Sequence, residues 1–172
     1  GARDGSAVAD PQLGVGEGVG ALALDGGLDD DTLWGEAGSD ALDGGSGTDL
    51  VRQSVDADHQ VLIDTLLTGE GSDTLANIEN GWLIGGISDN SLDAGGFTVG
   101  GVTLDGAVGD DTLRGSGDDD LLEGGLGIDL VLQNADTDQV LTDTSLTGQG
   151  TDVLSSIELA GLTDGNSDNS LD

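Results

Sequence analysis

The sequence predicts an all-β solenoid in which short parallel strands stack along one axis. The first observation is a nine-residue period: residues 26–51 read "GGLDDDTLWGEAGSDALDGGSGTDLV", with an aspartate at every ninth position and a bulky apolar residue two positions later. Nine fits neither the 3.6-residue period of a helix nor the two-residue alternation of a plain strand, so the unit must contain a turn and a strand. The second observation is a longer repeat. Self-similarity at a fixed period is typical of solenoids, whose units pack on their neighbours.

The longer repeat divides the chain into two units. "VTLDGAVGDDTLRG", which begins at Val102, matches "LALDGGLDDDTLWG", which begins at Leu22. After a one-residue deletion near His59 the match continues, with "LTGQGTDVLSSIE" from Leu146 over "LTGEGSDTLANIE" from Leu67. We therefore expect a divergent N-terminal coil or cap at 1–13, repeat unit 1 at 14–93 and repeat unit 2 at 94–172.

Each unit contains three consecutive nonapeptides that approximate G-G-x-G-x-D-x-U-x, where U is bulky and apolar. They occupy 26–52 and 106–132. The first six positions favour a turn because glycine and aspartate suit turns, and the last three favour a strand. Two nonapeptides make one coil, and equivalent residues of successive coils stack at about 4.8 Å. Position eight then points inward (Leu33, Leu42, Val51, Leu113, Leu122, Val131) and position nine outward (Trp34, Asp43, Arg52, Arg114, Glu123, Leu132).

The charge of the chain calls for a cation. The sequence has 35 acidic and 3 basic residues, a formal net charge of -32, and no cysteine. Such a charge disfavours a compact state and repels nucleic acid and anionic membranes, so we expect neither partner. The absence of cysteine excludes disulfides and thiolate metal sites. No apolar run approaches the ~20 residues of a membrane helix, so no membrane insertion is expected. The start "GARDGSAVAD" has neither Met nor a signal peptide, as expected of a fragment or a processed product.

The stacking predicts metal sites between coils. Asp31 with Asp49, and Asp111 with Asp129, lie two nonapeptides apart, and neighbouring carboxylates repel unless a cation lies between them. Calcium suits this position because it takes six to eight hard oxygen ligands in flexible geometry, whereas magnesium demands a stricter octahedron. The same spacing gives two weaker pairs along the other edge, Asp40 with Asp58 and Asp120 with Asp138. Partial nonapeptides place Asp73, Asp152, Asn90 and Asn169 at a sixth position, as possible turns.

The six nonapeptides resemble the calcium-binding repeat of RTX (repeats-in-toxin) proteins, whose consensus they follow. The resemblance implies a parallel β-roll with several calcium ions between adjacent turns. The implied ligands are the sixth-position carboxylates (Asp31, Asp40, Asp49, Asp111, Asp120, Asp129) and turn carbonyls near Gly45, Gly47, Gly125 and Gly127. Some turns depart from the consensus, with Asp29 or Asp118 at position four and Glu36, Ala107 or Ser116 at position two, and should bind less well. The spacers are expected to continue the solenoid as wider coils.

Other interpretations of these residues carry less weight. A purely solvated acidic surface would not keep glycine and apolar residues in phase with aspartate. His59 has Gln139 at the equivalent position and no serine or cysteine arrangement beside it, so a catalytic base is not indicated. Carboxylate pairs also serve glycosidases, but a chain with this many aspartates forms such pairs everywhere. Trp34, Trp82 and Phe97 could stack on sugars, although coil fillers or end covers are the simpler interpretation.

Three functions from different classes follow. We favour a calcium-binding structural segment of a secreted surface, matrix or filament protein, such as an adhesin stalk, stiffened by extracellular calcium. The alternative is an accessory module that assists secretion and folding of a secreted enzyme or toxin. An enzyme in its own right has almost no support. The resemblance further implies a bacterial protein exported by a type I-like route. Expected partners are calcium, other copies stacked end to end, or a cell-surface component.

Overall fold

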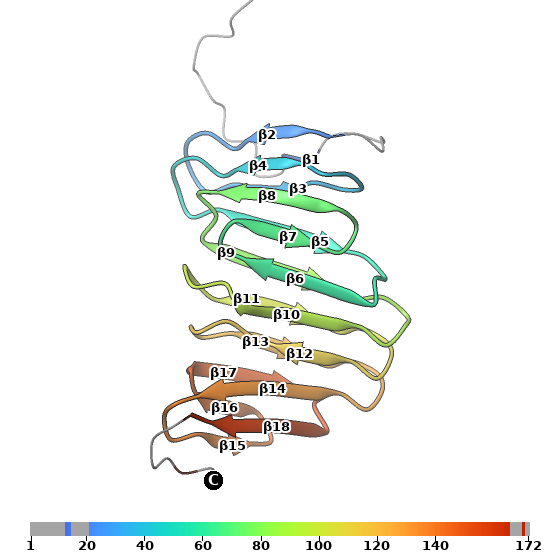
Figure 1. Cartoon of the computed structure of the whole chain (residues 1–172), viewed down its shortest axis with the longest axis vertical. Coiled ribbons are helices and arrows are strands. Elements are labelled where there is room, and N and C mark those ends of the chain that lie inside the picture. Colours follow the sequence, from blue (N-terminus) through green and yellow to red (C-terminus); the bar gives the residue numbers. More distant parts are fainter. Residues whose placement is uncertain (1–12, 15–20, 166–169, 171–172) are drawn as a thin grey trace, which may run out of the picture.

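The chain folds into two nine-stranded sheets that run along one axis and face each other (Figure 1). The computed structural model describes residues 13–14, 21–165 and 170. Within these residues all regular structure is strand, and no helix is present that could cross a bilayer. The all-β solenoid predicted from the sequence is therefore confirmed.

Sheet A contains the strands β1, β3, β5, β9, β11, β13, β17, β16 and β15, in that spatial order. Their bounds are Leu13–Gly14, Thr32–Trp34, Leu50–Ser54, Asn80–Ile84, Val102–Asp105, Leu121–Glu123, Gly150–Ser155, Ser145–Gly148 and Val140–Thr142. Sheet B contains β18, β14, β12, β10, β6, β7, β8, β4 and β2. Their bounds are Leu159–Asp164, Leu130–Ala135, Thr112–Arg114, Ser91–Gly96, His59–Ile63, Leu66–Thr68, Ser72–Ala76, Ala41–Asp43 and Ala23–Asp25.

The nonapeptide strands stack in the predicted register. Thr32 pairs with Leu50 in sheet A, and Thr112 pairs with Leu130 in sheet B, both in parallel and both two nonapeptides apart. Successive nonapeptides alternate between the two sheets, so one coil is made of two nonapeptides. Each strand is only a few residues long because the glycine-rich turn takes the other six positions of the period.

The core is a single apolar ladder between the sheets. All six position-eight side chains are buried, as predicted, and the inner residues of the spacer strands, such as Leu62, Leu83 and Leu104, continue the ladder. Phe97 is fully buried in the same cluster, which identifies it as a filler of the coil. The position-nine side chains lie on the outer faces and are half-buried or exposed.

The spacers differ from the wider coils that the sequence suggested. After β5 the chain forms β6, β7 and β8 as an antiparallel meander within sheet B, and after β14 it forms β15, β16 and β17 as the same meander within sheet A. The outer strands of the first meander pair in parallel with β4 and β10, so the solenoid continues across it. Beneath the first meander, the buried Gln53 side chain donates a hydrogen bond from Nε2 to Gln60 Oε1 at 3.0 Å. The two glutamines thus satisfy each other's polar atoms where the surrounding core is apolar.

The meander also exchanges the two sheets between the repeats. β2 lies in sheet B, but β11, its equivalent in the second unit, lies in sheet A. Three consecutive strands of each unit stay in one sheet, so the second unit starts on the opposite side. The predicted N-terminal cap at 1–13 and the terminal "SDNSLD" fall almost entirely outside the described residues, as does Asn169.

Candidate metal centres between the coils

The sixth-position aspartates lie at the end of each turn, and their carboxylates contact the backbone of the neighbouring coil. The Asp31 backbone N–H donates to Asp49 Oδ1 at 2.7 Å, and the Asp111 N–H donates to Asp129 Oδ1 at 2.8 Å. Each carboxylate therefore uses one oxygen to tie two coils together. The predicted stacking of Asp31 on Asp49 and of Asp111 on Asp129 is confirmed by these bonds.

The second oxygen of these carboxylates is buried and has no partner. This holds for Oδ2 of five aspartates: Asp31, Asp40, Asp49, Asp111 and Asp129. A buried polar atom without a hydrogen bond costs about 1–3 kcal/mol, and more when it carries charge. Nearly all buried polar groups in folded proteins have partners, so five equivalent exceptions indicate a partner that binds from outside the chain.

Four of these Oδ2 atoms lie close to a backbone carbonyl oxygen of the next coil, beside the first-position glycine; they belong to Asp31, Asp49, Asp111 and Asp129. A Cβ added to Gly26 would lie 2.6 Å from the Gly44 carbonyl oxygen and 2.8 Å from Asp31 Oδ2. A Cβ on Gly106 would similarly meet the Gly124 carbonyl oxygen at 2.5 Å together with Asp111 Oδ2. The first-position glycine thus leaves a cradle of hard oxygen atoms, the donor type that calcium takes.

The cradles of Asp49 and Asp129 use a different kind of carbonyl. There the oxygen comes from Asn77 and from Ser156, which have φ values of 50° and 52°. Positive φ is uncommon outside glycine and marks a turn held by its surroundings. Both residues occupy equivalent positions in the two units, so the same strained turn points a carbonyl at the carboxylate in each.

The electrostatics of the sites favour a bound cation. Burial raises the pKa of Asp49, Asp111 and Asp129, and neighbouring carboxylates raise it further, against the opposing effect of a backbone hydrogen bond. For Asp49 the main neighbouring charges are Glu79 and Asp31. Desolvation and like charge both penalise the ionised form, and a cation offsets both. In the described part of the chain, no group of three or more His, Cys, Asp or Glu side chains is placed to hold a metal ion.

Two glutamates that the sequence analysis missed terminate the carboxylate ladders. The Asp49 N–H donates to Glu79 Oε2 and the Asp129 N–H donates to Glu158 Oε2, both at 2.9 Å. The signal was present in the long repeat, because "NIE" and "SIE" occupy equivalent positions in the two units. Asn90, noted only as a possible turn, is buried and lies next in line to Asp111, to which its N–H donates at 2.7 Å.

The two weaker pairs were wrong. Asp40 does not stack on Asp58, since its N–H donates to Asp73 Oδ1 at 2.9 Å. Asp120 does not stack on Asp138, since its N–H donates to Asp152 Oδ1 at 3.1 Å. The reason is the meander, which brings β8 next to β4 and β17 next to β13.

Asp58 and Asp138 serve other contacts on the surface. Asp58 is exposed, and its carbonyl accepts the Ser91 N–H at 3.0 Å. Asp138 is also exposed, and its Oδ1 accepts the Ser170 N–H at 2.9 Å. Neither presents a buried carboxylate to a neighbouring coil.

The turn glycines named as carbonyl donors have a clear steric role. Gly45 and Gly125 have φ values of 94° and 101°, and a Cβ there would collide with the carbonyl oxygens of Gly27 and Ala107. Only glycine combines this conformation with so close an approach of the next coil. Gly47 and Gly127 show the same combination. Ligation by the carbonyls near these four glycines stays a prediction.

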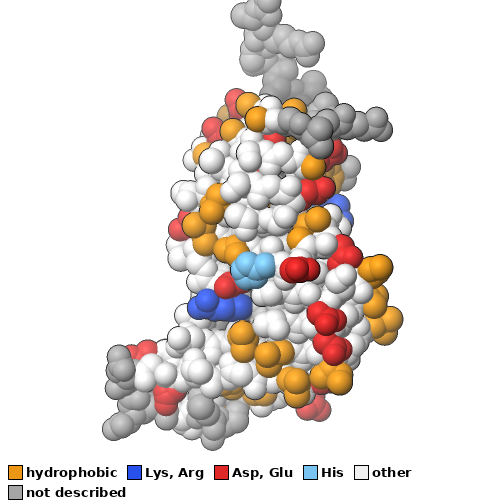
Figure 2. Space-filling model, turned by 45° about the vertical axis from the view of Figure 1, so that its right-hand side comes forward, with side chains coloured by type: hydrophobic (Ala, Val, Ile, Leu, Met, Phe, Trp, Pro, Cys, Tyr) orange, Lys and Arg blue, Asp and Glu red, His pale blue; other side chains and the backbone are white. Residues whose placement is uncertain are grey.

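The outer face of sheet A carries an aromatic–cation stack at the first unit. Arg52 Cζ lies 4.5 Å from the centroid of the Trp82 ring and 5.7 Å from that of Trp34. The three residues sit on adjacent strands β3, β5 and β9. Packing on the outer strands explains the two tryptophans without a sugar ligand. Figure 2 shows acidic side chains scattered among hydrophobic and uncharged ones on the face that it presents.

Stacked coils, a thin apolar ladder and inter-coil oxygen cradles define this chain as a parallel β-roll. Its sequence matches the family described as "RTX calcium-binding nonapeptide repeat (4 copies)" at residues 23–51 and 103–131, the two segments that contain the paired aspartates. These two segments are RTX-type calcium-binding repeats.

Beyond this family the similarities are distant. No curated protein matches the sequence. Among solved structures, the chain is similar to the extracellular lipase LipA from Serratia marcescens, at 17% identity and a TM-score of 0.23. That match covers 80% of this chain and 36% of the lipase.

Proposed function

We propose that this chain is a calcium-binding structural segment of a secreted surface, matrix or filament protein, which folds and stiffens when it meets extracellular calcium. The observation that carries the proposal is the set of buried, unpartnered Oδ2 atoms, which recurs in both units and in four cases faces a carbonyl of the next coil. The sites lie between coils, so each ion joins two turns of the solenoid and stiffens it along its axis.

Calcium-dependent folding follows from the charge of the chain. A formal charge of -32 on 172 residues opposes compaction, and the paired carboxylates come together only in the folded state. Where no preformed site exists in the unfolded chain, the free energy of metal binding is free energy of folding. Extracellular modules bind calcium at about 10⁻⁴ to 10⁻³ M. Affinity in this range would leave the chain unfolded in a low-calcium cytosol and fold it after export.

A structural role fits the shape of the molecule better than an accessory role, because the described residues form one continuous rod (Figure 1). The pockets of the described residues are lined by turn and strand residues of the solenoid, and His59 lies exposed on a strand end. An accessory module of a secreted enzyme would share the same calcium chemistry, so the two roles differ in what the parent protein carries.

The test is a calcium titration of the full chain followed by circular dichroism and small-angle X-ray scattering. We expect a disordered spectrum in chelator, a β-spectrum in millimolar calcium, and a change from an expanded coil to a rod at the same midpoint. A β-spectrum and rod dimensions that persist in chelator would contradict the proposal. Magnesium is the matched control and should fold the chain weakly, because it demands octahedral geometry and keeps its water.

A further inference from the structure

A row of exposed apolar side chains runs along one edge of the roll. Ile87, Val108 and Leu126 are each the third residue of a turn that leads from sheet A to sheet B, and they are 79%, 40% and 71% exposed. Ile128, in the same turn as Leu126, is 57% exposed. Figure 2 brings this edge forward, and hydrophobic side chains gather on it beside acidic ones. Single exposed apolar residues are common, but a contiguous row of them marks an interaction surface.

Backbone hydrogen bonds hold the row in register. The Val108 N–H donates to the Gly86 carbonyl at 3.1 Å, and the Leu126 N–H donates to the Ala107 carbonyl at 2.9 Å. Val108 and Leu126 form a parallel bridge. The third residues of the three turns therefore stack on successive coils, about 4.8 Å apart. Because they come from turns that are distant in the sequence, the row exists only in the folded chain.

Carboxylates flank the row on both sides. Asp89 and Asp110 lie two residues beyond the row in their turns and are exposed, and the Asp110 N–H donates to Asp89 Oδ1 at 2.9 Å. On the other side, the strands that lead into the turns end at Asp105 and Glu123, which pair with each other at the edge of the outer face of sheet A. The surface is thus an apolar row between two lines of negative charge.

The first unit does not repeat this surface. Its equivalent turns lie on the opposite edge, and there Leu28 is exposed, but Ser46 and Thr48 take the places of Leu126 and Ile128. The turn forms equally well with these polar residues, so folding does not require the leucine and isoleucine of the second unit. A surface that folding does not require, and that exposes apolar atoms to water, calls for a partner.

The charge of the chain decides what kind of partner fits. A second copy also carries a formal charge of -32 and has only three basic residues, so it would bring more carboxylates to the flanks. An amphipathic helix presents one apolar residue per turn, about 5.4 Å apart, which is close to the spacing of the coils. Lysine or arginine beside its apolar face would meet the two lines of carboxylates.

We propose that the row of Ile87, Val108 and Leu126 docks a basic amphipathic helix of another protein. The apolar face of the helix covers the row, Ile128 extends the contact at one end, and the flanking carboxylates hold the basic side chains. This docking surface adds a binding role to the proposed structural role. Its availability only in calcium rests on the proposed function, because calcium-dependent folding assembles the three turns.

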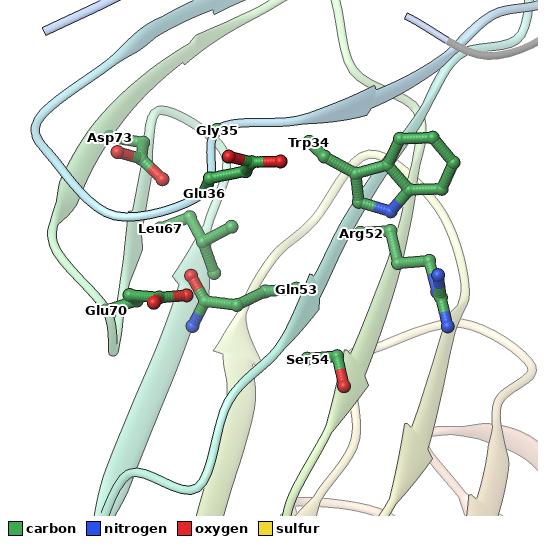
Figure 3. Close-up of a pocket in the computed structure, with 9 residues that line it drawn as sticks. All are labelled: Trp34, Gly35, Glu36, Arg52, Gln53, Ser54, Leu67, Glu70 and Asp73. Atoms are coloured by element: carbon green, nitrogen blue, oxygen red, sulfur yellow. The ribbon is translucent and has the colours of Figure 1, made fainter. Parts of the chain in front are cut away.

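One other surface of the described residues also attracts cationic groups, and the test must separate the two. A pocket of about 180 Å³ in the first unit has Glu36 and Glu70 on one side and Trp34 and Arg52 on the other (Figure 3). The Arg52 guanidinium opposes a basic partner there, and the pocket has no apolar row for a helix. We therefore expect the helix to dock on the row and not at this pocket.

The test measures binding of a labelled synthetic peptide to the full chain by fluorescence anisotropy. It is carried out in millimolar calcium and about 0.15 M salt, where exposed charges are largely screened. The peptide is a helix of leucine and lysine with all its leucines on one face. A peptide of the same composition, with its leucines spread around the helix, should bind at least tenfold more weakly because it loses the apolar contact. Equal binding of the two peptides would overturn the proposal.

The matched variants keep the net charge of the chain. Leu126→Ser with Ile128→Thr installs the residues of the first unit and should weaken binding of the amphipathic peptide at least tenfold. Leu28→Ser removes a leucine of similar exposure from the opposite edge and should bind as the wild type does. Equal binding by the double variant and the wild type would overturn the proposal. A double variant that changes only the sedimentation of the chain would also overturn it, because the row would then be a contact between copies.

Two charge variants locate the peptide. Glu123→Gln, beside the row, should weaken binding about two- to fivefold, as expected for one exposed ion pair. Glu70→Gln, at the pocket of the first unit, should leave binding unchanged, and the reverse result would overturn the proposal. Circular dichroism of the same samples separates the two proposals. A chain that folds with calcium but does not distinguish the peptides leaves the proposed function standing, whereas a chain that does not need calcium to fold contradicts the proposed function.

Discussion

Asp49→Ala should weaken the calcium-loaded fold far more than Asp43→Ala, although the two aspartates are close together in the sequence. Asp49 is fully buried, its Oδ1 accepts the Asp31 N–H at 2.7 Å, and its Oδ2 faces the inter-coil cradle. Asp43 lies on the outer face of β4, where its Oδ1 accepts a bond from Asn77 Nδ2 at 2.7 Å in an exposed setting.

The magnitude follows from two losses at Asp49. The Asp31 N–H is left buried without an acceptor, which costs about 1–3 kcal/mol. The ion between the coils is also lost, and at a calcium concentration about ten times the dissociation constant one ion contributes roughly 1.4 kcal/mol. The free energy of unfolding should thus fall by about 2.5–4.5 kcal/mol. Asp43→Ala removes one exposed hydrogen bond and should cost about 1 kcal/mol or less.

The assay is urea unfolding of both variants in calcium, followed by circular dichroism, and repeated in chelator for any β-structure that remains. The difference between the variants should shrink without calcium, because only the loss of the Asp31 acceptor persists. Equal losses for Asp49→Ala and Asp43→Ala in calcium would refute the assigned register, since the ninth-position residue would then matter as much as the sixth.

The same geometry sets four further expectations. Asp129→Ala against Glu123→Ala should repeat the contrast in the second unit, and matching calcium midpoints for the two variants would count against the sites. Gly44→Ala should reduce calcium affinity at least tenfold, because the added Cβ would collide with the Asn77 carbonyl oxygen and lie 2.6 Å from Asp49 Oδ2. The control Gly117→Ala, whose Cβ would meet no atom within 4 Å, should bind calcium as the wild type does. Calorimetry measures both affinities. Burial, with the charge of neighbouring Asp120, raises the pKa of Asp152 from 3.8 to about 7. The ionised Asp152 carboxylate therefore destabilises the calcium-free fold fully above about pH 7, and this destabilisation is lost as the pH falls toward 3.8. The calcium-free chain should gain β-structure by circular dichroism as the pH falls over this range, and a flat signal would contradict the assignment. Full chain at micromolar concentration should scatter more light in calcium than in chelator if uncovered solenoid ends stack on one another, and a folded, calcium-loaded monomer would exclude end-to-end assembly.

The nine-residue pattern predicted the local structure because each unit is decided by its own residues. Glycine and aspartate place the turn, the apolar residue at position eight places the strand, and nonapeptides two apart stack on each other with no choice of partner. This is why Asp31 with Asp49 and the burial of Leu33 and Leu113 could be predicted. The same logic failed at Asp58 and Asp138, where the glycines are lost and the count of nine continued into a segment that no longer follows it.

The sequence by itself determined the fold class, the need for a cation, and the carboxylates of the regular coils, since all three depend on contacts at a constant separation along the chain. The tertiary structure alone decided which strands meet across the spacers, because an antiparallel meander can return the chain to an earlier coil and no local period records that return. It thereby placed Asp73 against Asp40, made Glu79 and Glu158 the ends of the carboxylate ladders, and exchanged the two sheets between the repeats. The unpartnered oxygens are likewise a property of the packed coils, since only burial shows which carboxylate atoms the chain leaves without a hydrogen bond.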